Sequence, residues 1–138
     1  MSFRGTPPPI VVTRPDYERL SNLVDAAAEA MPLAGEDLAG ELDRARIVEA
    51  DEVAADVVTM HAQFAFKDSV TGETRTVSLV YPGEENIDEG RISILTPIGA
   101  ALLGLSEGQS VEWEARNGTP RTLTVVKLLS QPSPQSDH

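Results

Sequence analysis

Histidine, cysteine and acidic side chains build most catalytic and metal sites, and this sequence offers few of the first two. It contains two histidines, His61 and His138, and no cysteine. His138 is the last residue of the sequence, and His61 lies on the polar side of a segment with the alternation of a β-strand. We therefore interpret His61 as a surface histidine rather than a general base. No Ser-His-Asp or Cys-His set can be assembled, so we predict that the protein is not an enzyme.

Acidic residues gather in three stretches, at residues 36–43, 49–56 and 84–89. Such clusters could contact Mg²⁺, but the chain has 22 acidic and 11 basic residues, and in so acidic a sequence they usually form a solvated surface. No glycine-rich phosphate loop follows a predicted strand, and we expect no metal and no cofactor. The net charge of −11 repels phosphates, which disfavours direct nucleic-acid binding and suits a basic partner surface.

Length and composition predict one domain with a small appendage, because 138 residues with 41% hydrophobic content can bury one core. Only 4% of the residues are aromatic, so the core must be aliphatic. No apolar run approaches the roughly 18–20 residues that span a bilayer, and residues 1–9 lack the apolar centre of a signal peptide. We expect a cytoplasmic protein that does not contact a membrane.

Residues 91–105 are the stretch around which the second half of the chain is organised. Alternation at Ile92 and Ile94 predicts a strand, and the pattern then changes at Thr96 and Pro97. Threonine is a good helix N-cap, and proline is tolerated at the first helical position because the N–H there has no partner. A short helix follows and stops at Gly104. The sequence therefore predicts a strand, an exposed corner at residues 96–98 and a short buried helix.

The N-terminal part predicts two antiparallel helices over residues 13–49. The first begins with Thr13 as N-cap, carries apolar residues at steps of three and four, and ends at Pro32. A turn at residues 33–35 precedes a second helical pattern that extends to residue 48 or 49. Two interpretations stay open: the apolar stripes join and lean on the main domain, or the hairpin presents an acidic loop to a partner. The acidic residues are Glu36, Asp37 and Glu41.

The rest of the sequence predicts an antiparallel sheet of four or five strands. Residues 50–56 form a polar connector, and alternating strand patterns cover residues 57–66, 76–81, 110–115 and 123–129. Asn117-Gly118 is a strong signal for a hairpin turn. The predicted fold class is α+β. The predicted division is a lead-in at 1–12, a helical hairpin at 13–49, a sheet domain at 50–130 and a disordered tail at 131–138.

The second half also resembles the C-terminal domain of the Gre family of bacterial transcript-cleavage factors, which has an FKBP-like fold. The resemblance is carried by residues 68–73, 77–82, 90–105 and 107–108. Within this family, residues 41–45 and 56–60 together with Trp113 resemble the group of regulators of nucleoside diphosphate kinase. The resemblance implies an FKBP-like arrangement for residues 50–130 and a coiled-coil-like hairpin before it.

For function, the resemblance implies binding to core RNA polymerase. In Gre-like proteins the globular domain docks at the rim of the secondary channel and the hairpin enters it. By position, Thr96, Pro97 and Ile98 would then belong to the polymerase-binding surface. In Gre factors two acids at the hairpin tip share a Mg²⁺ with the polymerase. Here Asp37, with Glu36 and Glu41 nearby, is the nearest counterpart.

Hairpin length separates this chain from Gre factors. A first helix of under 20 residues is shorter than about 30 Å, whereas Gre hairpins are clearly longer. We therefore predict that the protein occupies the channel entrance and competes with Gre-type factors without stimulating transcript cleavage. The alternative is regulation of nucleoside diphosphate kinase level or activity through protein contact. Prolyl isomerisation, suggested only by the fold, is disfavoured because such pockets are lined by aromatic residues, which are scarce here.

Overall fold

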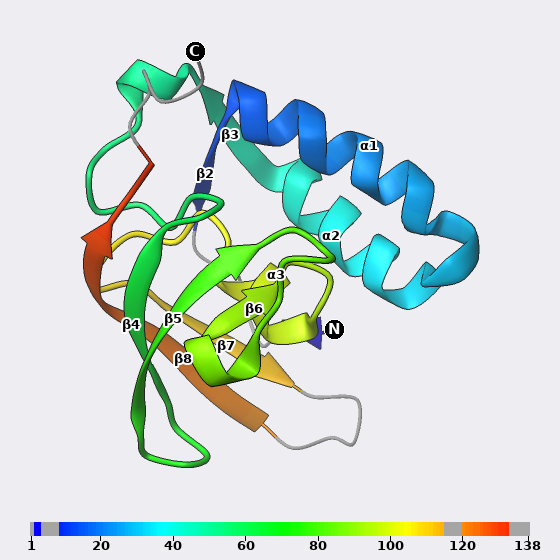
Figure 1. Cartoon of the computed structure of the whole chain (residues 1–138). Helices are drawn as coiled ribbons and strands as arrows, with labels where there is room; N and C mark the ends of the chain where they lie inside the picture. The colour runs from blue at the N-terminus through cyan, green and yellow to red at the C-terminus, as the bar shows by residue number, and fades with distance from the viewer. Residues whose placement is uncertain (1, 4–8, 115–119, 133–138) are drawn as a thin grey trace.

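A helical hairpin lies beside a twisted sheet in the computed structural model, which describes residues 2–3, 9–114 and 120–132 (Figure 1). The α+β class is therefore confirmed. The predicted turn at Asn117-Gly118 and most of the predicted tail lie outside the described residues. The predicted division of the chain into lead-in, hairpin, sheet domain and tail stays a prediction.

The hairpin consists of α1 (Arg14–Ala30) and α2 (Pro32–Arg44). As the sequence predicts, α1 begins after Thr13, whose side chain accepts a hydrogen bond from the Asp16 N–H at 3.4 Å. Only Met31 separates the two helices, so the predicted turn at residues 33–35 is wrong. Pro32 is compatible with this tight connection because it occupies the first turn of α2, where a helix needs no N–H from it.

The second helix ends at Arg44, and the prediction of helix to residue 48 or 49 is wrong. Residues Ala45–Val48 form β3, which pairs in parallel with β2 (Ile10–Thr13). The β-branched side chains of Ile47 and Val48 suit a strand, and pairing with β2 supplies the backbone hydrogen bonds that the helix would have supplied. A short 3₁₀ turn (Ala50–Glu52) then leads to the main sheet.

The main sheet has six strands in the order β1-β7-β8-β4-β5-β6. The strands are β1 (Ser2–Phe3), β4 (Gln63–Asp68), β5 (Thr74–Val80), β6 (Arg91–Ser93), β7 (Ser110–Glu114) and β8 (Pro120–Ser130). All neighbours are antiparallel except β5 and β6, so the sheet is mixed where the sequence predicts an antiparallel one. The segment between β5 and β6, which contains a 3₁₀ turn (Ile87–Glu89), returns the chain to the level of Ser78, so β6 runs in parallel beside the last three residues of β5.

The predicted strand at residues 57–66 starts only at Gln63. Before it, residues 57–60 are buried on both sides, unlike a strand with one solvated face. Their backbone bonds go elsewhere: the Val58 N–H donates to the Leu105 carbonyl at 2.8 Å. Position 61 is a left-handed residue with φ 65°, so His61 lies in a turn and not on a strand.

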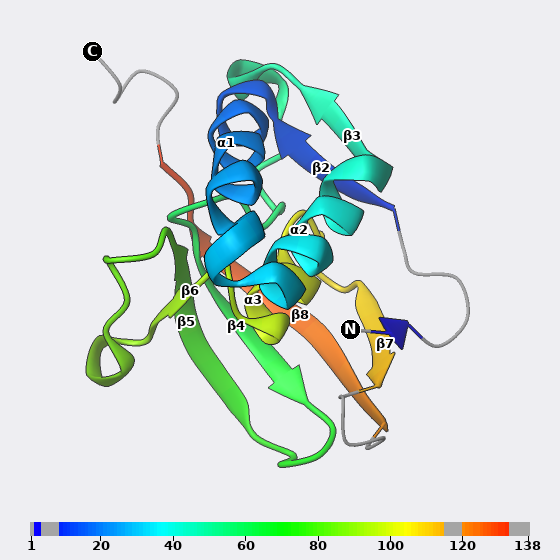
Figure 2. The ribbon, with the colours of Figure 1, turned by 90° about the vertical axis from the view of Figure 1, so that its right-hand side faces the viewer.

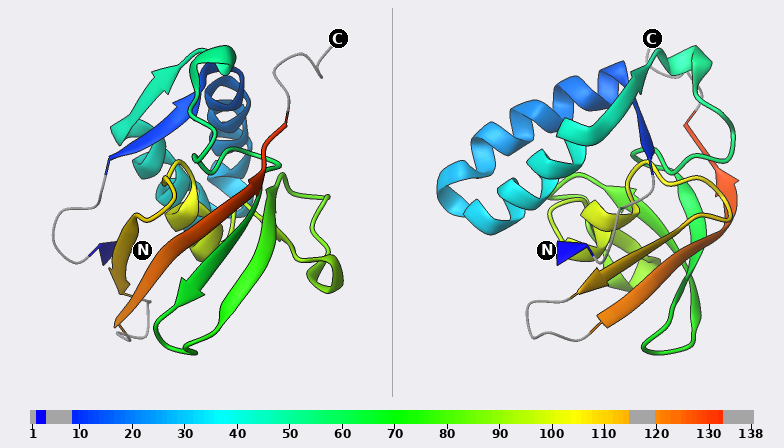
Figure 3. Two further views of the ribbon diagram at one scale, coloured as in Figure 1. Left: turned by 90° about the vertical axis from the view of Figure 1, so that its left-hand side faces the viewer. Right: turned by 180° about the vertical axis from the view of Figure 1, so that it is seen from behind.

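One apolar core joins the hairpin to the sheet. The short helix α3 (Pro97–Leu102) covers the sheet and contacts α2, and Figures 2 and 3 show all three helices on the same face of the sheet. Leu20 and Leu38 from the hairpin lie in the same buried cluster as Leu102 and Leu123. Phe64 and Phe66 are the only aromatic members of that cluster among the described residues. No helix in the described ranges is long and apolar enough to cross a membrane.

Candidate docking site

The exposed corner at residues 96–98 is held by local hydrogen bonds. The Thr96 hydroxyl donates to the Ser93 carbonyl at 2.7 Å and accepts from the Gly99 N–H at 3.1 Å, which caps α3. Pro97 is the first residue of α3, as the sequence predicts. Thr96 is exposed, and Pro97 is half-buried. The corner is therefore rigid before any partner arrives, and its side chains stay accessible.

Position 99 shows how tightly this corner is folded. A Cβ on Gly99 would lie 2.5 Å from the Ser93 carbonyl oxygen and 2.9 Å from the Thr96 hydroxyl oxygen. Both atoms belong to the capping network, so they cannot move away without breaking it. Only glycine allows the first turn of α3 to approach β6 this closely.

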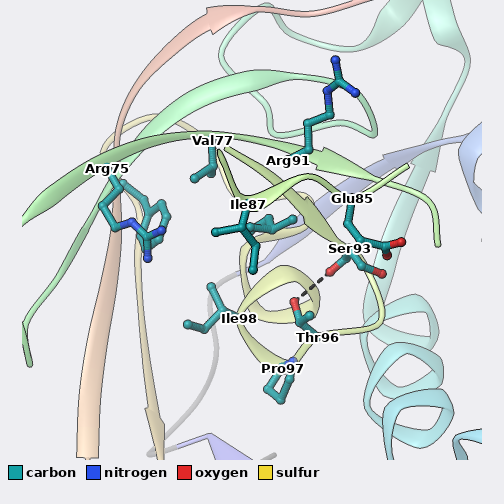
Figure 4. A pocket seen from close by; sticks show the side chains of 11 residues that line it. Arg75, Val77, Glu85, Ile87, Arg91, Ser93, Thr96, Pro97 and Ile98 are labelled. Carbon is teal, nitrogen blue, oxygen red and sulfur yellow. Dashed lines mark hydrogen bonds between the residues drawn. The ribbon is translucent and has the colours of Figure 1, made fainter. Parts of the chain in front are cut away.

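A pocket of about 430 Å³ opens beside the corner, between α3, β5 and β6 (Figure 4). Its lining is mainly apolar and includes Phe66, Val77, Ile87, Ile92, Pro97 and Ile98. Ile87 lies over it and is 82% exposed. Three charged residues complete the lining, namely Arg75, Glu85 and Arg91. A cavity of this size with apolar walls and few polar groups is typical of a binding site, and no sequence pattern indicates it.

The three predicted acidic residues lie on α2 and not in a loop. Glu36 is exposed and Asp37 is half-buried. Glu41 is 1% exposed and forms an ion pair with Arg44, with its Oε1 3.1 Å from Nη2. The structure thus leaves Glu41 out of any exposed acidic surface. At the tip of the hairpin lies Met31, which is 47% exposed, and the exposed Glu29 precedes it in the last turn of α1.

Comparison with known proteins gives two family matches, one for each part of the chain. Residues 41–130 match the family described as "Transcription elongation factor, GreA/GreB, C-term", and residues 8–48 match the family described as "Rnk N-terminus". The chain belongs to the GreA/GreB family. Its likeness to the nucleoside diphosphate kinase regulators within that family is also confirmed by these matches.

Individual relatives agree with the two family matches. The chain is 38% identical over 132 residues to the "Regulator of nucleoside diphosphate kinase" of Escherichia coli strain K12, covering 95% of this chain and 96% of the relative. It is 35% identical over 107 residues to the "Transcription elongation factor GreA" of Brucella anthropi, covering 75% of this chain and 67% of the relative.

A solved structure shows the same fold. The prokaryotic transcription elongation factor GreA/GreB from Nitrosomonas europaea superimposes with a TM-score of 0.68 at 35% identity. The match covers 88% of this chain and 98% of that chain. Most of this chain therefore shares the fold of that factor.

A polar cluster that the sequence patterns missed attaches the start of α1 to the sheet. The Asp16 carboxylate accepts a hydrogen bond from the Met60 N–H at 3.2 Å, and the Arg19 guanidinium lies 4.2 Å from the centre of the Tyr81 ring. His61 Nε2 lies 2.9 Å from Glu84 Oε1, and this bond lowers the pKa of Glu84. The Asp16 and Arg19 contacts join α1 to residue 60 and to the end of β5, which are far from it in sequence. Among the described residues no three metal-binding side chains converge.

Burial changes the pKa of the Glu41 carboxyl group. Desolvation raises its pKa to about 7 from 4.5, although the nearby Arg44 charge acts in the opposite direction. Between these two pH values the folded protein binds more protons than the unfolded chain, so its free energy of unfolding falls as pH rises. Because one pKa unit corresponds to about 1.4 kcal/mol, Glu41 is expected to contribute a loss of at most about 3.5 kcal/mol across this window.

Urea unfolding of wild type and Glu41→Gln from pH 4 to 8 measures this contribution. The wild type is expected to lose stability relative to Glu41→Gln as the pH rises from about 4.5 to 7. The exposed Glu36→Gln is the matched control: it retains Glu41, and its stability is expected to fall over this pH range as that of wild type does. A difference between wild type and Glu41→Gln that stays constant with pH would show that Glu41 does not titrate in this range.

Proposed function

We propose that this protein binds core RNA polymerase near the entrance of the secondary channel and competes there with Gre-type factors without stimulating transcript cleavage. The family membership makes it a Gre-related regulator. What we propose beyond this is the site of binding, the competition with Gre-type factors and the absence of cleavage stimulation. It includes no catalytic activity, no direct contact with nucleic acid and a cytoplasmic location.

The observation that carries the proposal is the short length of the helical hairpin. Helix α1 has 17 residues, which at about 1.5 Å per residue makes a rod of about 25 Å. The tip residue between the helices is Met31, and the acids Glu36 and Asp37 lie on α2 beyond it. A carboxylate helps to bind a catalytic Mg²⁺ only in direct contact, at about 2 Å. A hairpin of this length supports occupancy of the channel entrance without assistance to cleavage.

The capped corner supports the docking half of the proposal. Thr96, Pro97 and Ile98 occupy the positions that the family resemblance implies for polymerase contact. The hydrogen bonds of Thr96 hold this corner in one conformation. A preformed surface loses little conformational entropy on binding, which favours affinity.

Two assays test the proposal together. Fluorescently labelled protein is expected to bind core RNA polymerase and to be displaced by excess GreA. On stalled elongation complexes, saturating protein is expected to leave transcript cleavage at its basal rate and to inhibit the stimulation by GreA. Robust cleavage stimulation by this protein that disappears in Asp37→Ala would contradict the proposal, as would binding that GreA does not displace.

The relative from Escherichia coli favours a second candidate, because its name is that of a regulator of nucleoside diphosphate kinase. Here the partner would be the kinase itself, contacted directly. Affinity capture from lysate separates the candidates, because the large polymerase subunits and the small kinase differ greatly in mass. Capture of the kinase without polymerase subunits would favour this second candidate.

A further inference from the structure

We propose that the hairpin tip and the corner at residues 96–98 form one continuous docking surface. Its occupant is a protein segment with apolar residues at its centre, a basic residue at the hairpin end and an acidic residue at the Arg75 end. This inference rests on the proposed function, since RNA polymerase is taken to supply the segment. It goes further by making the hairpin part of the binding surface itself.

The geometric basis is a second groove that shares Pro97 with the pocket of Figure 4. This groove has a volume of about 380 Å³ and runs between the hairpin tip and α3. Its lining consists of Met31, Pro32, Leu33, Ala34, Asp37, Leu95 and Pro97. Pro97 therefore borders a groove on each side, one towards the hairpin and one towards the sheet. A segment that crosses Pro97 would contact both grooves.

Each of the two grooves is lined by a large apolar side chain that is strongly exposed to solvent. Ile87, at 82%, and Leu33, at 56%, are the two most exposed large apolar side chains in the described part of the chain. Ile87 lines the pocket on the sheet side, and Leu33 lines the groove on the hairpin side. Solvent-exposed apolar residues that cluster beside concave surfaces are typical of protein interaction sites. A partner that covers both grooves removes both side chains from water.

Charged residues at the two ends of the docking surface determine the orientation in which the occupant binds. At the hairpin end, the exposed Glu36 lies next to the groove-lining Asp37, and within the described residues the Glu36 side chain makes no hydrogen bond or ion pair. At the sheet end, Arg75 and Pro97 lie on different sides of the pocket (Figure 4). Within the described residues the Arg75 side chain makes no hydrogen bond or ion pair. The two ends thus favour opposite charges on the partner.

The other charged residues of the pocket have partners within the chain. Arg91 is paired with Glu89, with its Nη2 2.6 Å from Oε1. The Glu85 carboxylate accepts a hydrogen bond from the Gly83 N–H at 2.8 Å. Arg75 is therefore the cation of this pocket that is left for an acidic residue of the occupant.

Binding of full-length variants to core RNA polymerase tests the hairpin half of the inference. Leu33→Asp is expected to weaken binding about tenfold or more, because it places a carboxylate in an apolar contact. Val126→Asp is the matched control: Val126 is 48% exposed on β8 and lines neither groove. The control is expected to bind within about twofold of wild type. The melting temperature of each variant shows whether it is folded.

A second matched pair of variants, Arg75→Glu and Lys127→Glu, tests the inference about charge. Lys127 is exposed on β8 and lines neither groove. Arg75→Glu is expected to weaken binding about tenfold and to reduce its salt dependence, whereas Lys127→Glu leaves both unchanged. If Arg75→Glu binds polymerase with the same affinity and salt dependence as Lys127→Glu, the inference that the occupant has an acidic residue at the Arg75 end is wrong.

The outcomes separate this inference from the proposed function. If Pro97→Asp abolishes polymerase binding while folded Leu33→Asp binds like Val126→Asp, the corner docks alone and the inference is overturned. If the wild-type protein does not bind polymerase at all, the proposed function fails, whatever the variants do.

Discussion

Replacing Pro97 by aspartate is expected to weaken binding to core RNA polymerase about 30-fold or more, equivalent to about 2 kcal/mol. Pro97 lines both grooves and lies between the exposed Thr96 and the half-buried Ile98. A carboxylate at this central position would have to be desolvated against apolar surface on both sides without a partner. That cost is largest at the centre of an interface, where water is excluded.

The same substitution is expected to leave the fold intact. Pro97 is the first residue of α3, where the backbone N–H needs no helical partner and a negative charge is favoured by the helix dipole. The hydrogen bond from the Gly99 N–H to the Thr96 hydroxyl does not involve the Pro97 side chain. A melting temperature close to that of wild type is therefore expected. This separates lost binding from lost folding.

Val70→Asp is the matched control for Pro97→Asp. Val70 is 48% exposed in the turn between β4 and β5 and lines neither groove. Fluorescence titration of core polymerase is expected to give wild-type affinity for this variant. Wild-type affinity of folded Pro97→Asp would remove the corner from the docking surface, and equal weakening by both variants would point to net charge as the cause.

Gly104→Ala is expected to lower the free energy of unfolding by about 3 kcal/mol or more. Gly104 has φ +80°, which costs an L-residue about 1–2 kcal/mol. A Cβ there would also lie 2.7 Å from the Ile10 Cβ and 2.9 Å from the Val11 carbonyl oxygen. Relief would require β2 to move away, although the Val11 N–H donates to the Gly104 carbonyl at 3.1 Å. The strain therefore spreads to the contact between the hairpin base and α3.

Alanine substitutions at two other glycines separate the cost of the backbone conformation from the cost of steric overlap. Gly108 also has a positive φ, +87°, but no atom lies within 4 Å of the position that a Cβ would take there, so Gly108→Ala measures the backbone cost alone. Gly40 lies within α2 with open space around it, and Gly40→Ala is expected to stabilise by about 0.5–1 kcal/mol. Urea unfolding gives all three values. Equal losses for Gly104→Ala and Gly108→Ala would show that β2 gives way without cost.

Features set by neighbouring residues could be predicted from the sequence. The Thr96 cap and Pro97 at the start of α3 follow from the hydrogen-bonding needs of a helix terminus, and the same argument places the start of α1 after Thr13. The spacing of apolar residues in residues 14–30 predicts the buried side of α1, where Leu20 and Ala27 are buried. These signals are local, because a cap or a helical turn involves residues three or four positions apart.

Other features depend on contacts between distant segments, and the sequence patterns did not predict them. Residues 45–48 are a strand because β2 lies beside them, and Glu41 is buried although it is an acidic residue of a helix that packs against other elements. The parallel pairing of β6 with β5 likewise depends on the path of the intervening loop.

The exposed corner, the α+β class and the short hairpin all follow from the order of residues, because capping, hydrophobic periodicity and helix length are properties of adjacent residues. The position of the hairpin tip beside that corner, which gives Pro97 a groove on either side, is visible only in the folded chain. Both grooves are formed by side chains from segments far apart in the chain. Their packing follows from burial of the shared core, which no local pattern records.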